Sequence, residues 1–437
     1  MNDASVSEVD RLRRRVRDLE RLLETDRRAG LREIRSAAAA VPEPAPAESA
    51  PPSLEDLPEH VRRAVEAARA KARAEAQNGV DVAFYPDFRG GNPYQEMLFS
   101  GARAAGLGVA PLPWAPESLV HEKADPDRGY VVNLHWTAPV LQTSEHSAEA
   151  VRRLDHFTAM LDELAERGGR LLWTVHNVLP HECPYRLLEI ELCRRLAERA
   201  DLVHVMDDST VEAVRDLYPL DPAKVRVVPH ASYQGVYPDT ATRAEARERH
   251  GLGEDETAVL VLGGLRRYKA PERLLEAFEQ AAARHPGLRL LIAGEPDGDP
   301  ELGPFVERCE SDPRIVCHFG RVADDDLQWW LRAADLAALP YANVLNSGFL
   351  HLATGYGLPV VAPDVPGLRN ILEPAWSQSF PPEADAPVLA EALLAGAERL
   401  GNAEARAAAA ARGASYPPEA MADEFLTLLT SLGVKPA

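Results

Sequence analysis

The chain contains 437 residues, of which 46% are hydrophobic and 27% are charged, and its 48 basic and 68 acidic residues give a formal net charge of −20. This length accommodates two ordinary domains, and the acidity excludes a surface that attracts nucleic acid over its whole area. The four cysteines show no metal-binding or redox spacing, and the sequence contains neither a secretory segment nor an apolar run of about 18 residues. We therefore expect a cytoplasmic protein that does not span a membrane and binds no nucleic acid.

Residues 1–36 predict a highly charged helix. Three heptads are only marginally stable alone, so this helix is either an arm that forms a homodimer or a helix that packs on its own domain or frays. Residues 37–53 are rich in Ala and Pro and predict a semi-extended linker, and a polar helix follows over residues 54–77. The apolar residues of the predicted coiled-coil seam recur at alternating spacings of three and four: Val9, Leu12, Val16, Leu19 and Leu23.

From Val80 onward, strand and helix patterns alternate in two blocks. The first block predicts strands over 80–85, 130–134, 171–175, 202–206 and 225–228, with helices over 94–105, 148–167 and 185–199. The second block predicts strands over 258–262, 289–293, 315–319, 336–339 and 359–362, with helices over 271–284 and 324–334. Strands that alternate with helices of this length require parallel sheets with right-handed crossovers. The chain is therefore α/β, with one doubly wound domain over residues 54–240 and a second over 241–415, and a final helix within 416–437 is expected to cross back to the first domain.

The most informative segment runs from Asp335 to Pro363. An apolar strand ends there in the polar turn Asn346-Ser347-Gly348, and an amphipathic helix follows and stops at Gly357. The turn places backbone N–H groups and small polar side chains at a helix N-terminus, beyond the carboxyl end of a strand. In an open α/β sheet this is where a phosphate is held.

A basic cluster, GGLRRYK, follows the first strand of the second block at residues 263–269. Its two glycines permit a sharp turn, and Arg266 and Lys269 are three residues apart, so one local fold can aim both at a cleft. Two positive charges match a diphosphate, and arginine adds bidentate geometry. A solvated basic turn is the alternative interpretation of these residues taken alone.

A Gly-Gly loop follows the first strand of the first block. It contains Asp87, Gly91 and Asn92, and Tyr94 opens the next helix. This arrangement points a helix N-terminus at the carboxyl edge of the sheet, where ligands bind. Asn92 before Pro93 is equally typical of a structural helix cap.

Histidines follow two further strands of the first block. His135 ends the strand predicted over 130–134, and His176, His181 and Glu182 follow the strand predicted over 171–175. A single histidine at a strand end is more often structural than catalytic. Because the carboxyl ends of parallel strands meet at one edge, we expect these side chains to cluster, which favours a functional site.

Taken together, the second block resembles the nucleotide-binding domain of GT-B glycosyltransferases, especially bacterial exopolysaccharide and glycolipid enzymes of the mannosyl type. The resemblance rests on GGLRRYKAPERLLEAF, LLIAGE, VCHFGRV and GLPVVAP, and it extends over residues 80–432. It implies two Rossmann-like domains in GT-B arrangement, with the nucleotide-sugar donor on the second domain and the acceptor on the first. The donor-binding residues that it implies are Gly264, Arg266, Lys269, Arg321, Asn346, Ser347 and Gly348, and the acceptor-binding residues are Asp87, Gly91, Asn92, Tyr94 and His135.

The resemblance also implies catalytic roles. His176 is expected to touch the donor sugar or its departing phosphate, and His181 and Glu182 are candidates for the base if the reaction inverts configuration. No metal or other cofactor is implied. Retaining members with the best-known pattern carry two glutamates eight residues apart, but the corresponding positions here hold Val344 and Leu352. The phosphate-binding turn is kept, whereas the anomeric outcome stays open.

The expected activity is sugar transfer from a GDP-, UDP- or dTDP-sugar to an acceptor hydroxyl in polysaccharide, glycolipid or natural-product glycosylation. Peripheral membrane contact and a homodimer formed through the N-terminal helix are further expectations. Two alternatives remain. One is a nucleotide-sugar epimerase of the same two-domain shape, and the other is a non-catalytic GT-B-like protein that uses its coiled coil to regulate a partner enzyme.

Overall fold

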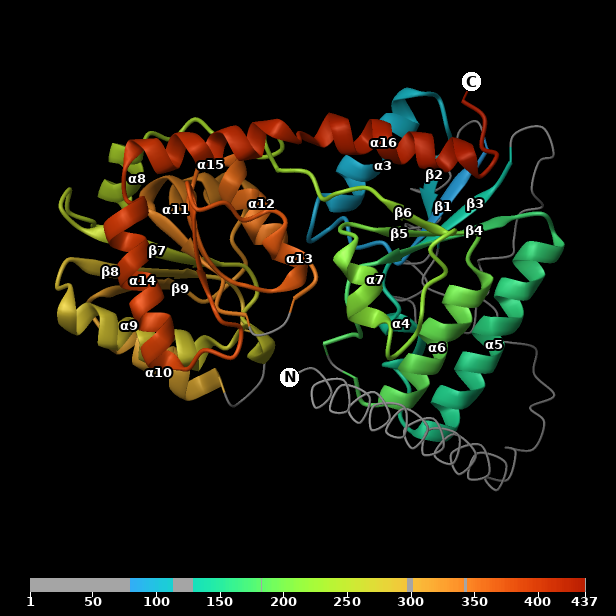
Figure 1. Ribbon diagram of the computed structural model, residues 1–437, viewed down its shortest axis with the longest axis horizontal. Coiled ribbons are helices and arrows are strands. Elements are labelled where there is room, and N and C mark those ends of the chain that lie inside the picture. Colours follow the sequence, from blue (N-terminus) through green and yellow to red (C-terminus); the bar gives the residue numbers. More distant parts are fainter. Residues whose placement is uncertain (1–78, 113–128, 182, 297–301, 342–343, 437) are drawn as a thin grey trace, which may run out of the picture.

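A computed structural model describes residues 79–112, 129–181, 183–296, 302–341 and 344–436. Figure 1 shows two α/β domains side by side, with the C-terminal helices running along one edge of both. The predicted coiled-coil arm and linker, the helix over 54–77 and Glu182 lie outside the described residues.

The first domain contains a six-stranded parallel sheet in the order β2-β1-β3-β4-β5-β6. Strands β1, β3 and β5 are buried along their whole length, as expected for a parallel sheet covered by helices on both faces. Its strands are β1 (Val82–Tyr85), β2 (Val109–Pro111), β3 (Val131–Leu134), β4 (Arg170–Val175), β5 (Leu202–Val205) and β6 (Val225–Val227). Its helices are α3 (Tyr94–Ala104), α4 (Ala138–Leu141), α5 (Ser147–Glu166), α6 (Arg186–Arg199) and α7 (Ser209–Val214).

The second domain contains another six-stranded parallel sheet, in the order β12-β11-β10-β7-β8-β9. The order of connection reverses between β7 and β10, and in open α/β sheets ligands bind outside the carboxyl ends of the strands at such a point. Its strands are β7 (Thr257–Leu262), β8 (Leu288–Ala293), β9 (Ile315–His318), β10 (Leu336–Ala338), β11 (Val360–Pro363) and β12 (Ser377–Phe380). Its helices are α8 (Arg243–Arg249), α9 (Pro271–Arg284), α10 (Gly303–Ser311), α11 (Leu327–Ala333), α12 (Gly348–Gly355), α13 (Pro366–Arg369), α14 (Ala386–Leu400) and α15 (Ala403–Ser415), with 3-10 turns over Arg267–Lys269 and Asp324–Asp326.

The predicted pair of doubly wound parallel sheets is confirmed. Strands β2 and β12, each of which lies at the edge of its sheet, are not predicted by the sequence pattern. Edge strands are short and often polar, and β12 reads SQSF, so neither segment carries the apolar run that marked the central strands. The predicted domain boundaries at 240/241 and 415/416 stay predictions.

The C-terminal helix α16 (Pro418–Ser431) packs against α3 of the first domain (Figure 1). Where the chain crosses between domains, the Ser232 amide donates to the Tyr416 carbonyl at 3.0 Å. One apolar cluster is continuous through both sheets and α16, with Val82, Leu260 and Phe425 among its fully buried members. The two domains therefore share buried surface as well as two crossing segments.

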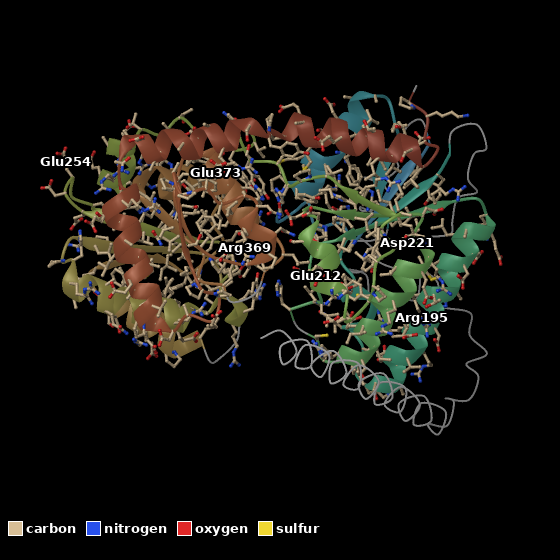
Figure 2. The ribbon with its side chains drawn as sticks, viewed as in Figure 1. Arg195, Glu212, Asp221, Glu254, Arg369 and Glu373 are labelled. Atoms are coloured by element: carbon tan, nitrogen blue, oxygen red, sulfur yellow. The ribbon has the colours of Figure 1, made fainter. Side chains whose placement is uncertain are left out.

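A further contact between the domains lies beside helices α7 and α13, which pack against each other. Figure 2 labels Glu212 on α7 and Arg369 on α13, on either side of the domain junction. The Asn370 side-chain amide, just after α13, donates to the Asp207 carboxylate at 3.1 Å. This contact ties the end of β5 to the second domain.

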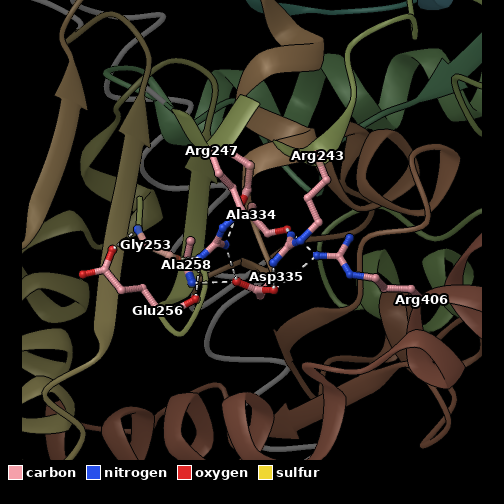
Figure 3. Close-up of polar contacts among 9 residues, drawn as sticks. Arg243, Arg247, Gly253, Glu256, Ala258, Ala334, Asp335 and Arg406 are labelled. Atoms are coloured by element: carbon pink, nitrogen blue, oxygen red, sulfur yellow. Dashed lines mark hydrogen bonds and ion pairs between the residues drawn. The ribbon is translucent and has the colours of Figure 1, made fainter. Parts of the chain in front are cut away.

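A buried carboxylate, Asp335, lies at the amino end of β10 (Figure 3). Arg243 and Arg247 come from α8, where the chain enters the second domain, and Arg406 comes from α15, from which it returns to the first. Removing one partner of a buried ion pair costs about 3–5 kcal/mol, so this cluster holds both connections against the sheet. The groups that donate to Asp335 are the Ala258 amide at 2.9 Å and the guanidinium groups of Arg243 at 2.6 Å, Arg247 at 3.1 Å and Arg406 at 3.4 Å.

Candidate functional site

A cleft of about 1620 Å³ lies between the carboxyl ends of the two sheets. The structure brings most of the predicted site residues to its walls. Asp87 is not among the lining residues and pairs with Arg89, their side chains 2.8 Å apart, and Glu182 lies outside the described residues. The predicted residues that line the cleft are Gly91, Asn92, Tyr94, His135, His176, His181, Gly264, Arg266, Lys269, Arg321, Asn346, Ser347 and Gly348.

The second-domain wall begins at the glycine turn after β7. Gly263 has a φ of +96°, which disfavours any side chain, and a Cβ on Gly294 would stand only 2.2 Å from the Gly263 carbonyl oxygen. The ends of β7 and β8 can therefore approach this closely because Gly294 has no Cβ, and the turn at Gly263 takes a φ that favours glycine. The side chains of Arg266 and Lys269 fold back over this turn. A Cβ placed on Gly264 would lie 3.9 Å from Arg266 Nε, and a Cβ placed on Gly263 would lie 3.6 Å from Lys269 Nζ.

The ammonium group of Lys269 lies 5.9 Å from the centre of the Tyr341 ring, which follows β10. Burial lowers the pKa of Lys269 to about 8, and the positive charge of Arg266 adds to that shift. Two cations held together in a partly desolvated place favour an anionic ligand, which would restore the usual protonation of the lysine. The wall is thus positively charged at the reversal point of the sheet.

Helix α12 starts at the same place. Ser347 is its N-cap residue, and the Ser347 hydroxyl accepts a hydrogen bond from the Leu350 amide at 3.3 Å. Ser347, Gly348 and Phe349 line the cleft, so the N-terminus of α12 and the positive end of its dipole lie at the cleft, as suits a phosphate. Val344 and Leu352, at the positions of the missing glutamates, also line the cleft, so this stretch of wall is apolar.

The first-domain wall contains a pair of histidines at the ends of β3 and β4. His135 Nδ1 and His176 Nε2 are 3.0 Å apart, and the Trp136 ring stacks on His176 at 4.0 Å and 13°. Tyr94 meets the edge of His176 at 5.4 Å. Burial lowers the pKa of both histidines well below their ordinary value, so both are neutral at pH 7. One nitrogen of the contact donates and the other accepts, which leaves His176 Nδ1 for a substrate.

Asn92 has a structural role in the loop after β1. Its side-chain oxygen accepts hydrogen bonds from the Tyr94 amide at 2.9 Å and from the Tyr233 hydroxyl at 3.2 Å. The first contact fixes the start of α3, and the second joins this loop to the segment that crosses between the domains. His230, in that segment, stacks on His351 of α12 at 4.5 Å with parallel rings.

Three contacts cross the cleft and join residues distant in sequence. Arg321 Nη2 donates to the Gly90 carbonyl at 2.9 Å. The His181 ring stacks on Tyr268 at 3.6 Å and 3°. In the third contact, the Asn346 side-chain amide donates to the His176 carbonyl at 3.1 Å. These side chains therefore hold the two walls together, in addition to any contact with a substrate.

The sequence analysis did not select several residues of the cleft. Phe88, 37% exposed, packs on Trp136 at 5.0 Å, and the two form an aromatic surface beside His176. Tyr268 and Gln142 also line the cleft. An available signal was the position of Trp136 directly after a histidine that ends a strand. Gln142 follows the short helix α4, which the sequence pattern did not predict.

Among the described residues, no group of three or more His, Cys, Asp or Glu side chains could hold a metal ion. The described helices include none that is both long and apolar enough to cross a membrane. Metal independence and cytoplasmic location stay predictions.

Two family models match the chain. The model of glycosyl transferases group 1 matches residues 256–398, which contain the cationic wall, and the model of glycosyltransferase family 4 matches residues 150–231, which contain His176 and His181 of the opposite wall. The matched segments thus cover parts of both domains, on either side of the cleft.

Curated relatives are glycosyltransferases. A GDP-mannose:glycolipid 4-β-D-mannosyltransferase of Xanthomonas campestris pv. campestris is 28% identical over 308 residues, which are 69% of this chain and 79% of that protein. A D-inositol 3-phosphate glycosyltransferase of a Nocardioides strain is 30% identical over 193 residues, 41% of this chain and 42% of that protein. The chain therefore spans less than half of the second relative.

Solved structures share the fold. Sucrose-phosphate synthase from Thermosynechococcus elongatus superposes with a TM-score of 0.60 at 19% identity, covering 82% of this chain and 97% of that one. Anabaena HepE in complex with UDP gives a TM-score of 0.58 at 14% identity, covering 80% and 100%. At these identities the likeness concerns the arrangement of the two domains.

Proposed function

For this chain, which belongs to the GT-B glycosyltransferases, we propose transfer of a sugar from a nucleoside diphosphate donor on the second domain to an acceptor hydroxyl on the first. The observation that carries the proposal is the pairing of a cationic wall with a wall of neutral histidines across one cleft. A diphosphate gains negative charge as it leaves, whereas an acceptor hydroxyl must lose a proton. The cationic wall suits the leaving diphosphate, and the wall of neutral histidines suits the hydroxyl that loses its proton.

On the donor side, Arg266, Lys269 and the N-terminus of α12 stabilise the diphosphate. Their contribution grows as the bond from the sugar C1 to the phosphate oxygen breaks and the oxygen keeps the electron pair. GDP-mannose is the first donor to test, because it appears in the name of the mannosyltransferase that aligns with 69% of this chain. UDP- and dTDP-sugars follow.

On the acceptor side, His176 Nδ1 accepts the proton of the attacking hydroxyl, and the acceptor oxygen forms the new bond to C1. His135 Nδ1, 3.0 Å from His176 Nε2, accepts a hydrogen bond that orients the base and stabilises its charged form. The base and the departing diphosphate then lie on opposite walls, which favours inversion at C1. Val344 and Leu352 carry no carboxylate that could support retention of configuration instead. His181 is engaged with Tyr268, which makes it the weaker candidate for the base.

The acceptor is proposed to combine hydroxyl groups with an apolar part, because Phe88 and Trp136 present an aromatic surface at the cleft. Glycolipid intermediates and glycosylated natural products both have this chemistry. Octyl β-glucoside is a simple probe of the same kind. A homodimer formed through residues 1–36 and peripheral membrane contact remain further proposals, and elution of a chain that lacks residues 1–53 tests the dimer.

The test combines binding and turnover. GDP-mannose, UDP-glucose and dTDP-glucose are compared by thermal shift, since a ligand that binds the folded chain raises its unfolding temperature, and the rise grows with the ratio of ligand concentration to Kd. The donor that binds is then incubated with octyl β-glucoside, and formation of a glycoside one hexose heavier is followed by mass spectrometry. Conversion of the donor without acceptor would indicate the epimerase, and binding without any product would indicate the non-catalytic alternative.

A further inference from the structure

The side-chain NH₂ group of Asn92 is a hydrogen-bond donor that the mechanism above does not use. The Asn92 oxygen accepts from the Tyr94 amide at 2.9 Å and from the Tyr233 hydroxyl at 3.2 Å. A backbone amide can only donate, so these contacts fix which atom of the side-chain amide is oxygen and which is nitrogen. The nitrogen forms no hydrogen bond within the described part of the chain, and Asn92 lines the cleft. Its two N–H donors are therefore available to a ligand there.

Tyr233 places this amide at the start of α12. A Cβ on Gly348 would lie 3.2 Å from the Tyr233 hydroxyl oxygen, so that hydroxyl lies against the first residue of the helix. A Cβ on Gly355 would lie 3.4 Å from the Tyr233 amide nitrogen, so the crossing segment follows α12 further along. Arg321 holds the same loop from the second domain through its bond to the Gly90 carbonyl at 2.9 Å. The loop after β1 thus lies next to the phosphate-binding turn.

Tyr94 relates the same amide to the base. Its backbone nitrogen bonds Asn92, and its ring meets the edge of His176 at 5.4 Å. Under the proposed function, the sugar C1 lies between the phosphate at the N-terminus of α12 and His176. Asn92 is joined to one side of this space through the Tyr233 hydroxyl and to the other side through Tyr94. A sugar held in this way lies beside the Asn92 NH₂ group.

The second-domain wall offers few side-chain groups to the hydroxyls of that sugar. Val344 and Leu352, which line the cleft, have no polar side-chain atom. The Asn346 amide is engaged with the His176 carbonyl, and the Ser347 hydroxyl caps α12. A binding site fixes the orientation of a ligand through a small number of placed polar groups, so a polar group on the opposite wall has a function here.

We propose that the Asn92 NH₂ group donates to a hydroxyl oxygen of the transferred sugar and that Tyr233, as a positioning residue, holds the Asn92 amide in place. This inference rests on the proposed function and moves Asn92 from the acceptor to the donor. The first domain then supplies a contact with the sugar that the apolar stretch of the second domain lacks. Because the contact is made to the sugar, it should stabilise GDP-mannose but not GDP.

Binding of GDP-mannose and of GDP, measured by isothermal titration calorimetry, tests the proposal. Asn92→Ser keeps a side-chain oxygen that can cap α3 and removes the NH₂ group. We expect its Kd for GDP-mannose to rise about three- to tenfold and its Kd for GDP to stay within about twofold of the natural value. Tyr233→Phe keeps the ring and removes the hydroxyl, so it should weaken GDP-mannose alone and by less. The double variant should bind GDP-mannose no more weakly than Asn92→Ser, because both changes act through one amide.

Asn402→Ser is the matched control. Asn402 caps α15 in the same way, its side-chain oxygen accepting from the Ala405 amide at 2.9 Å, and it does not line the cleft. This variant should bind both ligands as the natural chain does, and Asn92→Ser should unfold at about the same temperature as this control.

GDP-deoxymannoses that each lack one hydroxyl identify the oxygen concerned. One of them should bind the natural chain about three- to tenfold more weakly than GDP-mannose and lose nothing further in Asn92→Ser. Equal weakening of GDP and GDP-mannose would assign the NH₂ group to the diphosphate, and a change confined to the acceptor KM would assign it to the acceptor. Either result overturns the proposal. If the natural chain binds no nucleotide sugar, the proposed function itself has failed.

Discussion

The two walls of the cleft differ in their charge. The second-domain wall combines Arg266 and Lys269 with the N-terminus of a helix, whereas the first-domain wall combines neutral histidines with Tyr94 and Trp136. Each domain contributes the carboxyl edge of a parallel sheet, so the same architecture supports both environments. Under the proposed function, the difference teaches that the residues at the strand ends, and not the fold, divide the work between holding a leaving diphosphate and activating an acceptor.

Burial acts on both walls in the same direction but with opposite consequences. It lowers the pKa of Lys269 to about 8 and that of His176 well below 6.5. An anionic ligand returns the proton to the lysine, so the shift makes that position responsive to the donor. For His176, the same shift keeps the imidazole unprotonated and ready to act as a base.

Arg266→Ala should give the largest effect, because it removes a full positive charge from the cationic wall. We expect kcat/KM for the donor to fall about a hundred- to a thousandfold, which is about 2–4 kcal/mol of transition-state stabilisation. Steady-state kinetics with GDP-mannose measure this loss. Arg284→Ala, exposed on α9 and not among the residues that line the cleft, is the control. A variant that keeps more than half of its turnover would refute the assignment of Arg266 to the diphosphate.

His176→Ala tests the other wall. It should lower kcat about a hundredfold and leave the donor KM nearly unchanged, because the base acts on the acceptor. Pre-steady-state quenched-flow separates the chemical step from product release. His156→Ala, exposed on α5, serves as the control. A large increase in donor KM with kcat preserved would instead place His176 in donor binding.

The sequence predicted the cationic wall well, because its parts are local. Arg266 and Lys269 are three residues apart, and the Asn346–Gly348 turn opens the helix that follows it, so a short segment fixes where each group lies. The reversal of strand order between β7 and β10 then brings the two segments together. Short-range chemistry and a general rule of α/β topology were sufficient for this half of the site.

The contacts across the cleft could not be predicted in this way. Arg321 was expected at the donor, yet its guanidinium group donates to Gly90, 231 positions earlier in the chain. Such contacts depend on how two separately folded sheets are oriented, and no local pattern encodes that orientation.

Trp136→Leu should sharpen the comparison at the first-domain wall by admitting water to His176. The pKa of His176 should then rise toward its ordinary 6.5, because burial is what lowers it. At mildly acidic pH a larger fraction of His176 is then protonated and cannot act as a base. The acid limb of the kcat/KM profile should therefore shift to higher pH. We expect a loss of up to about twofold at pH 6.5, growing to about tenfold at pH 5.5, and almost none at pH 8. Trp136→Phe keeps an aromatic ring and should retain most of the natural profile. An unchanged acid limb in the leucine variant would count against this role of the stacking.

Lys269→Arg should give the smallest effect and the most specific one. Free enzyme that carries Lys269 loses this positive charge above pH 8, so its donor kcat/KM should fall about tenfold per pH unit there. Arginine keeps its charge throughout, but it holds the phosphate with a different geometry and should cost a few-fold at pH 7. The ratio of variant to natural kcat/KM should therefore rise between pH 7 and 9.5. A ratio that stays level would mean that Lys269 remains charged through this range, and the contrast between the walls would then rest on Arg266 and α12.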